Sequence, residues 1–155
     1  MPLTKIIPAA RLEGMREHLI AFAKEFGITD MKQQPHVANT RKAIAIAEYA
    51  RDQGKLQEFR YAGMDAYWRG GKDIEDDAVL REIAAGVGLD PDAAIAATTD
   101  RKYTDRIDAR RREANAVGVT GIPTFVIGDQ GVVGCQPYEV LEQFVVEAGG
   151  AKKRG

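Results

Sequence analysis

The feature that most constrains the fold is a change in the spacing of apolar residues at Gly118. Between Ala10 and Gly118 apolar residues recur mainly at helical spacing, with turn and cap residues between the segments. After Gly118 the runs Thr124–Ile127 and Val132–Val133 are rich in β-branched and aromatic residues, which favours strands. The chain is therefore predicted to form a helical array followed by strand, strand and helix.

Cap and turn residues divide the region before Gly118 into successive predicted helices. Asp90-Pro91 is a strong start signal, because aspartate caps a helix and proline at the first helical position loses no needed hydrogen bond. Asp76 and Asp77 suit the positive end of a helix dipole. The first predicted helix has an apolar face formed by Met15, Leu19, Phe22 and Phe26. The next three run from Asn39 or Thr40 to Gly54, from Leu56 to Trp68 and from Asp76 to Gly88. A short helix follows Asp90, and a longer one spans Asp100–Val117.

The segment after Gly118 predicts a hairpin and one further helix. The residues Gly128-Asp129-Gln130-Gly131 lie between the two strand-like runs, as expected for a hairpin connection. Pro137 is placed to start a helix that continues through Phe144 to Gly149.

Composition excludes several classes of protein. The 22 basic and 23 acidic side chains nearly balance, so no strong field would attract nucleic acid or an anionic membrane. The apolar runs are far shorter than the roughly 20 residues of a membrane helix, and the start of the chain has no signal-peptide pattern. We expect a cytoplasmic location, neither a nucleic-acid nor a membrane partner, and no cofactor.

One motif, Gly118-Val-Thr-Gly-Ile-Pro-Thr-Phe-Val-Ile-Gly128, carries most of the functional information. Proline is tolerated at the first position of a strand because it has no N–H to donate. The motif resembles the cis-proline signature of thioredoxin-like proteins. Further stretches, listed here, resemble the FrnE-like branch of the DsbA family: Asn39-Thr40-Arg41, Ala47 to Ala50, Ala66-Tyr67-Trp68, Gly88 to Pro91 and Gln136 to Leu141.

This resemblance implies an α/β, thioredoxin-like fold with a large helical insertion, covering residues 1–155 as a single domain. Residues 10–118 would form the helical lobe, and residues 119–149 the strand, strand and helix of the thioredoxin fold. The resemblance also implies a binding groove for an extended peptide or a thiol substrate. Its residues would be Gly121, Ile122, Pro123 and Thr124.

The chain departs from the family at its amino-terminal end. Met1 to Pro8 resembles the end of the family's second strand, so the preceding strand, Cys-x-x-Cys motif and helix have no counterpart, and the sheet is expected to be incomplete. Dithiol exchange needs an attacking thiolate and a second, resolving thiol, whereas Cys135 is the only cysteine. We therefore expect a DsbA-like oxidoreductase relative without dithiol activity of its own. Whether the sequence is a fragment of a longer protein is left open.

Other reactive residues have structural interpretations that outweigh functional ones. Cys135 is a weak catalytic candidate beside a helix start, where helix-terminal amides lower a thiol pKa if the thiol is exposed. His18 and His36 lack metal-ligand spacing with each other or with Cys135, so no metal site is predicted. Arg110 to Arg112 are interpreted as a solvated face, and Tyr67-Trp68 as packing in the helical lobe.

Two alternative functions stay open, and the sequence also leads us to expect a homodimer. The chain is alternatively a non-enzymatic module for peptide binding or self-assembly, or a relative of kappa-class glutathione transferase and 2-hydroxychromene-2-carboxylate isomerase. An isolated hairpin is marginally stable in water. We therefore expect a homodimer in which Leu3–Ile7 or the hairpin of one subunit completes the sheet of the other.

Overall fold

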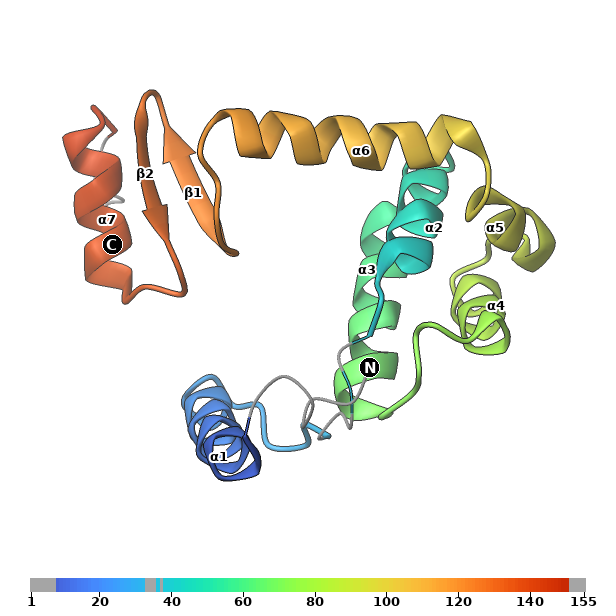
Figure 1. The fold of residues 1–155 in the computed structure, drawn as a ribbon, viewed down its shortest axis with the longest axis horizontal. Helices are drawn as coiled ribbons and strands as arrows, with labels where there is room; N and C mark the ends of the chain where they lie inside the picture. The colour runs from blue at the N-terminus through green and yellow to red at the C-terminus, as the bar shows by residue number, and fades with distance from the viewer. Residues whose placement is uncertain (1–7, 33–35, 37, 151–155) are drawn as a thin grey trace. The chain divides into compact units, whose positions relative to one another are not determined.

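The computed structural model describes residues 8–32, 36 and 38–150. Its elements divide between two compact units, Met1–Asp108 and Ala109–Gly155. Among the described residues, no helix is long and apolar enough to cross a membrane. Along the chain lie α1 (Ala9–Glu25), α2 (Arg41–Asp52), α3 (Leu56–Met64), the π-helix η2 (Asp65–Arg69), α4 (Asp77–Gly86), α5 (Pro91–Ala97), α6 (Arg101–Ala116), β1 (Thr124–Ile127), β2 (Gln130–Val133) and α7 (Tyr138–Glu147) (Figure 1).

Within the described residues the order of elements is the predicted one, and each helix and strand predicted there is present. The start signals of α4 and α5 are confirmed by their hydrogen bonds. The Asp76 carboxylate accepts a hydrogen bond from the Ala78 N–H, and the Asp90 carboxylate accepts one from the Asp92 N–H, both at 2.8 Å. Pro91 occupies the first turn of α5, where its missing N–H costs nothing.

The start of α2 shows which of two candidate residues supplies the cap. The Asn39 Oδ1 accepts a hydrogen bond from the Arg41 N–H at 3.1 Å. Thr40 lies at the cap position itself, but its side chain makes no cap hydrogen bond. Asn39 therefore satisfies one of the free N–H groups at this end of the helix.

The core of the first unit lies where α2, α3, α4 and α5 meet. Ile46 and Leu80 are fully buried, and Phe59 is 3% exposed. Burying a side chain of this size contributes about 1.5–3 kcal/mol. The cluster consists of Ile46, Ala50, Phe59, Leu80, Ile83, Ala84, Leu89 and Ala94, and a smaller one consists of Ala45, Ala97 and Tyr103.

Charged side chains connect α2 to the start of α6. The Asp52 carboxylate lies 2.7 Å from Arg106 Nη1 and 2.6 Å from Lys102 Nζ. Hydrogen bonds from Arg106 and then from Lys102 lower the pKa of Asp52 to about 2. One turn earlier Glu48 is buried, and its carboxylate lies 3.2 Å from the Arg51 side chain. These pairs belong to the packing of the helical unit.

The second unit is a hairpin followed by a helix. β1 and β2 pair antiparallel, with Thr124 opposite Val133 and Ile127 opposite Gln130. Gly128 begins the two-residue turn at a φ of +61°, a conformation that favours glycine. The second strand thus starts at Gln130, two residues before the predicted run. None of the described residues of this unit is buried.

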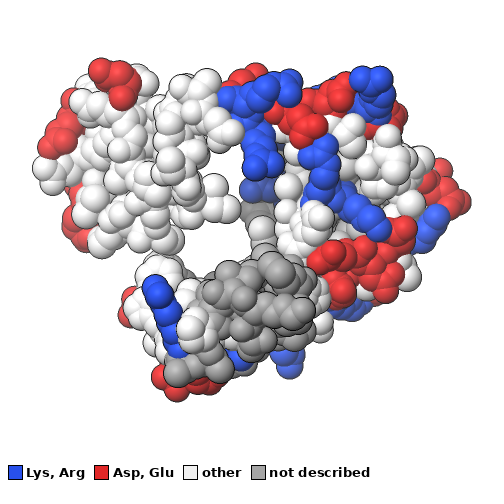
Figure 2. Space-filling model, in the orientation of Figure 1, with Lys and Arg blue, Asp and Glu red and all other residues white. Residues whose placement is uncertain are grey.

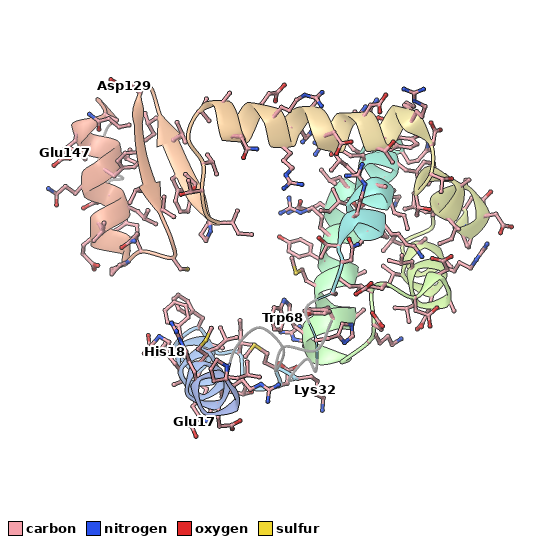
Figure 3. The ribbon with its side chains drawn as sticks, in the orientation of Figure 1. Glu17, His18, Lys32, Trp68, Asp129 and Glu147 are labelled. Atoms are coloured by element: carbon pink, nitrogen blue, oxygen red, sulfur yellow. The ribbon has the colours of Figure 1, made fainter. Side chains whose placement is uncertain are left out.

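Charged side chains are distributed unevenly along the chain. Residues 114–150 contain no Lys or Arg, whereas the helical unit carries both signs over its surface (Figure 2). The acidic residues of 114–150 lie in the hairpin turn and on α7; Asp129 and Glu147 are two of them (Figure 3).

Two details of the helical unit differ from the prediction. Among the described side chains of α1, Leu12 and Ala23 are buried. Met15, Leu19 and Phe26 of the predicted apolar face are exposed, and Phe26 lies just beyond the end of the helix. The third helix widens into η2 from Asp65, where a hydrogen bond joins the Gly70 N–H to the Asp65 carbonyl at 2.8 Å.

Glycine suits the end of η2 for a steric reason. A Cβ at Gly70 would lie 2.6 Å from the Ala66 carbonyl oxygen, a distance that real Cβ atoms do not tolerate.

The predicted strand at Leu3–Ile7 and the charged tail at Lys152–Arg154 lie outside the described residues.

Candidate functional site

The four predicted groove residues form the entry to β1. The Ile122–Pro123 peptide bond is cis. The Thr124 Oγ1 donates a hydrogen bond to the Gly121 carbonyl at 2.6 Å, and the Gly134 N–H donates one to the Pro123 carbonyl at 2.8 Å. Two hydrogen bonds therefore hold this short turn from both ends, and the structure brings Gly121, Ile122, Pro123 and Thr124 together.

Ile122 is the most exposed large apolar residue of the described chain, with 93% of its surface accessible. Exposing a whole isoleucine side chain forgoes the free energy that burial would give, about 1.5–3 kcal/mol. Its position directly before a strand makes it available to a partner. It is therefore a candidate contact residue.

The free edge of β1 adjoins this turn. Within the described residues β1 has a strand on one side only, namely β2. The Pro123 carbonyl points toward β2, because it accepts the hydrogen bond from Gly134. Hydrogen-bonding direction alternates along an antiparallel strand, so the N–H and C=O groups of Thr124 and Val126 face the opposite, open edge.

A hollow of about 500 Å³ lies between β1 and α7. Its walls are mostly apolar, and no charged side chain lines it. Phe125, Val126 and Val145 remain more than a third exposed there. The lining residues are Thr124, Phe125, Val126, Ile127, Leu141, Phe144 and Val145.

Cys135 is exposed and lies two residues after the end of β2. Its neighbour Gly134 is the residue that hydrogen-bonds to Pro123, so the thiol lies one residue beyond the pair that closes the hairpin. It is the one cysteine of the chain. No second thiol exists in this sequence to resolve a mixed disulfide on Cys135.

The remaining residues singled out in the sequence lie elsewhere. His18 lies on α1 (Figure 3), and Arg110 to Arg112 lie on exposed positions of α6. Tyr67 and Trp68 stack edge to face at 4.9 Å, and burial raises the pKa of the Tyr67 hydroxyl. None of these residues lines the hollow.

His36 has neighbours that reasoning from the sequence missed. Its Nε2 lies 3.7 Å from a carboxylate oxygen of Asp73 and 3.7 Å from one of Glu75. The expectation of no metal site rested on the spacing of His36 from His18 and Cys135 alone. A separation of 37 residues between His36 and Asp73 leaves no local spacing that would have revealed the cluster.

Comparison with known proteins places the fold. The family model of the DSBA-like thioredoxin domain matches residues 1–146. The uncharacterized protein YwbO of Bacillus subtilis strain 168 is 28% identical over 98 residues, which are 63% of this chain and 49% of YwbO. The chain thus spans about half the length of that relative.

Solved structures give the same result. A probable DsbA oxidoreductase from Streptomyces coelicolor matches with a TM-score of 0.82 and 25% identity, over 99% of this chain and 70% of that one. A 2-hydroxychromene-2-carboxylate isomerase matches with a TM-score of 0.73 and 19% identity, over 90% and 66%. A putative protein disulfide isomerase from Nitrosomonas europaea has a TM-score of 0.71 and 18% identity, over 95% and 76%. The last two likenesses show the fold alone.

Proposed function

The chain belongs to the family of DSBA-like thioredoxin domains, and from this premise we propose that it binds an extended polypeptide at Gly121–Thr124 and along the free edge of β1. We assign it to the thiol–disulfide oxidoreductases of that family, in the FrnE-like branch, as a member without dithiol exchange of its own. Its proposed role is to hold a polypeptide substrate, while any dithiol chemistry comes from cysteines outside this sequence.

The observation that carries the proposal is the open edge of β1 beside a fully exposed Ile122. Strand addition supplies backbone hydrogen bonds that depend little on the peptide's sequence, and side-chain pockets add selectivity. The outward N–H and C=O groups of Thr124 and Val126 provide the backbone hydrogen bonds, and the exposed Ile122 provides a side-chain contact. Such a surface suits unfolded polypeptides of varied sequence.

A pair of proline substitutions tests which edge binds. Val126→Pro removes an N–H from the open edge of β1, and Val133→Pro removes one from the outer edge of β2, because both residues occupy outward positions in the register. The probe is a fluorescein-labelled ten-residue peptide of alternating Val and Thr, measured by anisotropy. We expect Val126→Pro to weaken binding at least about tenfold and Val133→Pro to leave it unchanged. Equal losses in both variants would contradict the proposal.

The side-chain contribution is tested at Ile122. Because Ile122 packs on almost nothing in the free chain, Ile122→Ala should leave stability unchanged and weaken peptide binding about three- to tenfold. Unchanged binding in this variant would remove Ile122 from the site.

The absence of autonomous dithiol exchange is tested by insulin reduction with dithiothreitol. One thiol attacks a disulfide but has no partner to complete the exchange. We expect the purified chain and its Cys135→Ser variant to give the same rate as dithiothreitol alone. A faster rate that disappears in Cys135→Ser would establish Cys135 as a single-thiol catalyst.

The second candidate, a non-enzymatic peptide-binding module, is favoured by the same edge and by the single cysteine. It differs from the first in predicting no contribution to thiol exchange even with a cysteine-bearing partner present. Adding a reduced thioredoxin to the insulin assay separates them, because a substrate-presenting relative should raise the rate and a simple binding module should not. The isomerase alternative has fold likeness as its support.

For the exposed apolar hollow we propose a second copy of the chain as its cover. The hollow carries no charge, and a two-fold interface would bring the same apolar surface to both sides. Val145→Glu places a charge in the hollow, whereas Val117→Glu, outside it, is the matched control. We expect light scattering to give a dimer mass for the wild type and for Val117→Glu, and a monomer mass for Val145→Glu. A monomeric wild type at micromolar concentration would overturn this assembly.

A further inference from the structure

A cluster of side chains of metal-ligating types lies in the helical unit and includes no residue of β1 or α7. His36 comes from the connection between α1 and α2, and Asp73 and Glu75 come from the turn before α4. One ligand atom from each, the imidazole nitrogen and two carboxylate oxygens, lies within 4.8 Å of the others. Two segments far apart in the sequence therefore converge on one point.

Backbone donors fix both carboxylates. The Glu75 N–H donates a hydrogen bond to Asp73 Oδ1 at 2.9 Å, and the Asn39 N–H donates one to Glu75 Oε1 at 2.8 Å. Hydrogen bonds of this kind orient metal ligands in proteins. Each oxygen keeps a further lone pair for a cation.

The distances suit a small divalent cation. Tetrahedral zinc with ligands at about 2.0 Å separates neighbouring ligand atoms by about 3.3 Å. The imidazole nitrogen lies 3.7 Å from each carboxylate oxygen, and all three ligand atoms lie within 4.8 Å of one another. Binding would therefore need the ligand atoms to close by between a few tenths of an ångström and about 1.5 Å. The side chains of His36, Asp73 and Glu75 are 28%, 48% and 39% exposed, which leaves room for water to complete the coordination.

The donor set selects the class of metal. An imidazole nitrogen beside two carboxylates favours first-row transition metals over Ca²⁺ or Mg²⁺, which prefer oxygen ligands alone. Two carboxylates also neutralise the charge of one divalent ion. The Lys42 ammonium pairs with Asp77 at 2.7 Å, and its hydrogen bond to Glu75 goes to the backbone carbonyl at 3.3 Å.

We propose that His36, Asp73 and Glu75 bind a divalent first-row transition-metal ion, with Zn²⁺ as the probe. The ion would join the α1–α2 connection to the turn before α4, and so stabilise the helical unit. This site is independent of the proposed peptide-binding edge.

The test is calorimetric titration of the full chain with ZnCl₂. We expect one site per chain, with an affinity that falls at least about tenfold in His36→Ala and in Glu75→Gln. Glu75→Gln keeps the oxygen that accepts from Asn39, so the turn should stay folded. The controls are His18→Ala, which removes the one other histidine, and Cys135→Ser, which removes the thiol.

A second readout separates a site from a folding defect. Zn²⁺ should raise the thermal midpoint of the wild type, His18→Ala and Cys135→Ser, and should not raise that of His36→Ala or Glu75→Gln. Circular dichroism of the metal-free variants shows whether each is folded. Zinc affinity unchanged in both ligand variants, or lost equally in His18→Ala or Cys135→Ser, would overturn the proposal and identify adventitious binding.

Discussion

The helical unit and the second unit, which holds β1, β2 and α7, differ in how fully they bury their apolar side chains. α2 to α5 enclose a core with Ile46 and Leu80 fully buried, whereas no described residue of Ala109–Gly150 is buried. A two-stranded hairpin with one helix has too little surface to enclose a core. The first unit therefore has a buried core of its own, whereas the second leaves apolar side chains such as Phe125 and Val126 exposed.

The largest expected effect comes from a matched pair of leucine truncations. Leu80→Ala removes a fully buried side chain and should lower the free energy of unfolding by about 2–5 kcal/mol. Leu141→Ala, at a half-exposed position of α7, should cost about 1 kcal/mol or less. The measurement is urea unfolding followed by fluorescence of Trp68, which is the only tryptophan and lies in the helical unit. Similar losses of unfolding free energy in the two variants would contradict the difference in burial between the two units.

A matched pair of charge removals comes next. Glu48→Gln removes the charge of a buried carboxylate that pairs with Arg51, and should cost about 1–3 kcal/mol. Glu147→Gln, on exposed α7, should change stability by less than about 0.5 kcal/mol. Both variants are compared by thermal unfolding at neutral pH. A larger loss for Glu147→Gln would mean that α7 contributes more than its exposure indicates.

The helix cap at Asp90 provides a smaller effect. Asp90→Ala loses the hydrogen bonds from the Asp92 and Ala93 N–H groups and should cost about 1 kcal/mol. Asp105→Ala, on an exposed position of α6, is the control and should stay within about 0.5 kcal/mol of the wild type. If both variants match the wild type in urea unfolding, the cap does not contribute to the stability of the helical unit.

The smallest effect concerns pH. The pKa of Asp52 is about 2 in the folded chain, below its ordinary value of 3.8, so its ionised form stabilises the fold above about pH 4. That contribution should disappear as the pH falls from about 4 to about 2. Asp52→Asn should therefore lose less stability than the wild type over this range, as measured by urea midpoints at successive pH values. Asp129→Asn, in the hairpin turn, should follow the wild-type profile.

The sequence by itself determined the local structure and the family. Helical periodicity, the cap at Asp90 and the glycine at Gly128 are short-range features, because each depends on residues only a few positions apart. The order of helices, hairpin and final helix was therefore predictable. The thioredoxin-like family was also predictable from the sequence. Gly121, Ile122, Pro123 and Thr124 are consecutive in the chain, so their proximity needed no tertiary structure.

The tertiary structure decided what depends on distant segments. Periodicity showed that α1 has an apolar face, but Leu12 and Ala23 are buried while Met15 and Phe26 are exposed. The widening into η2 at Asp65 was likewise invisible in the sequence. His36 meets Asp73 and Glu75 only because two connections converge. Burial and through-space contacts depend on which segments pack together, and no local spacing records that information.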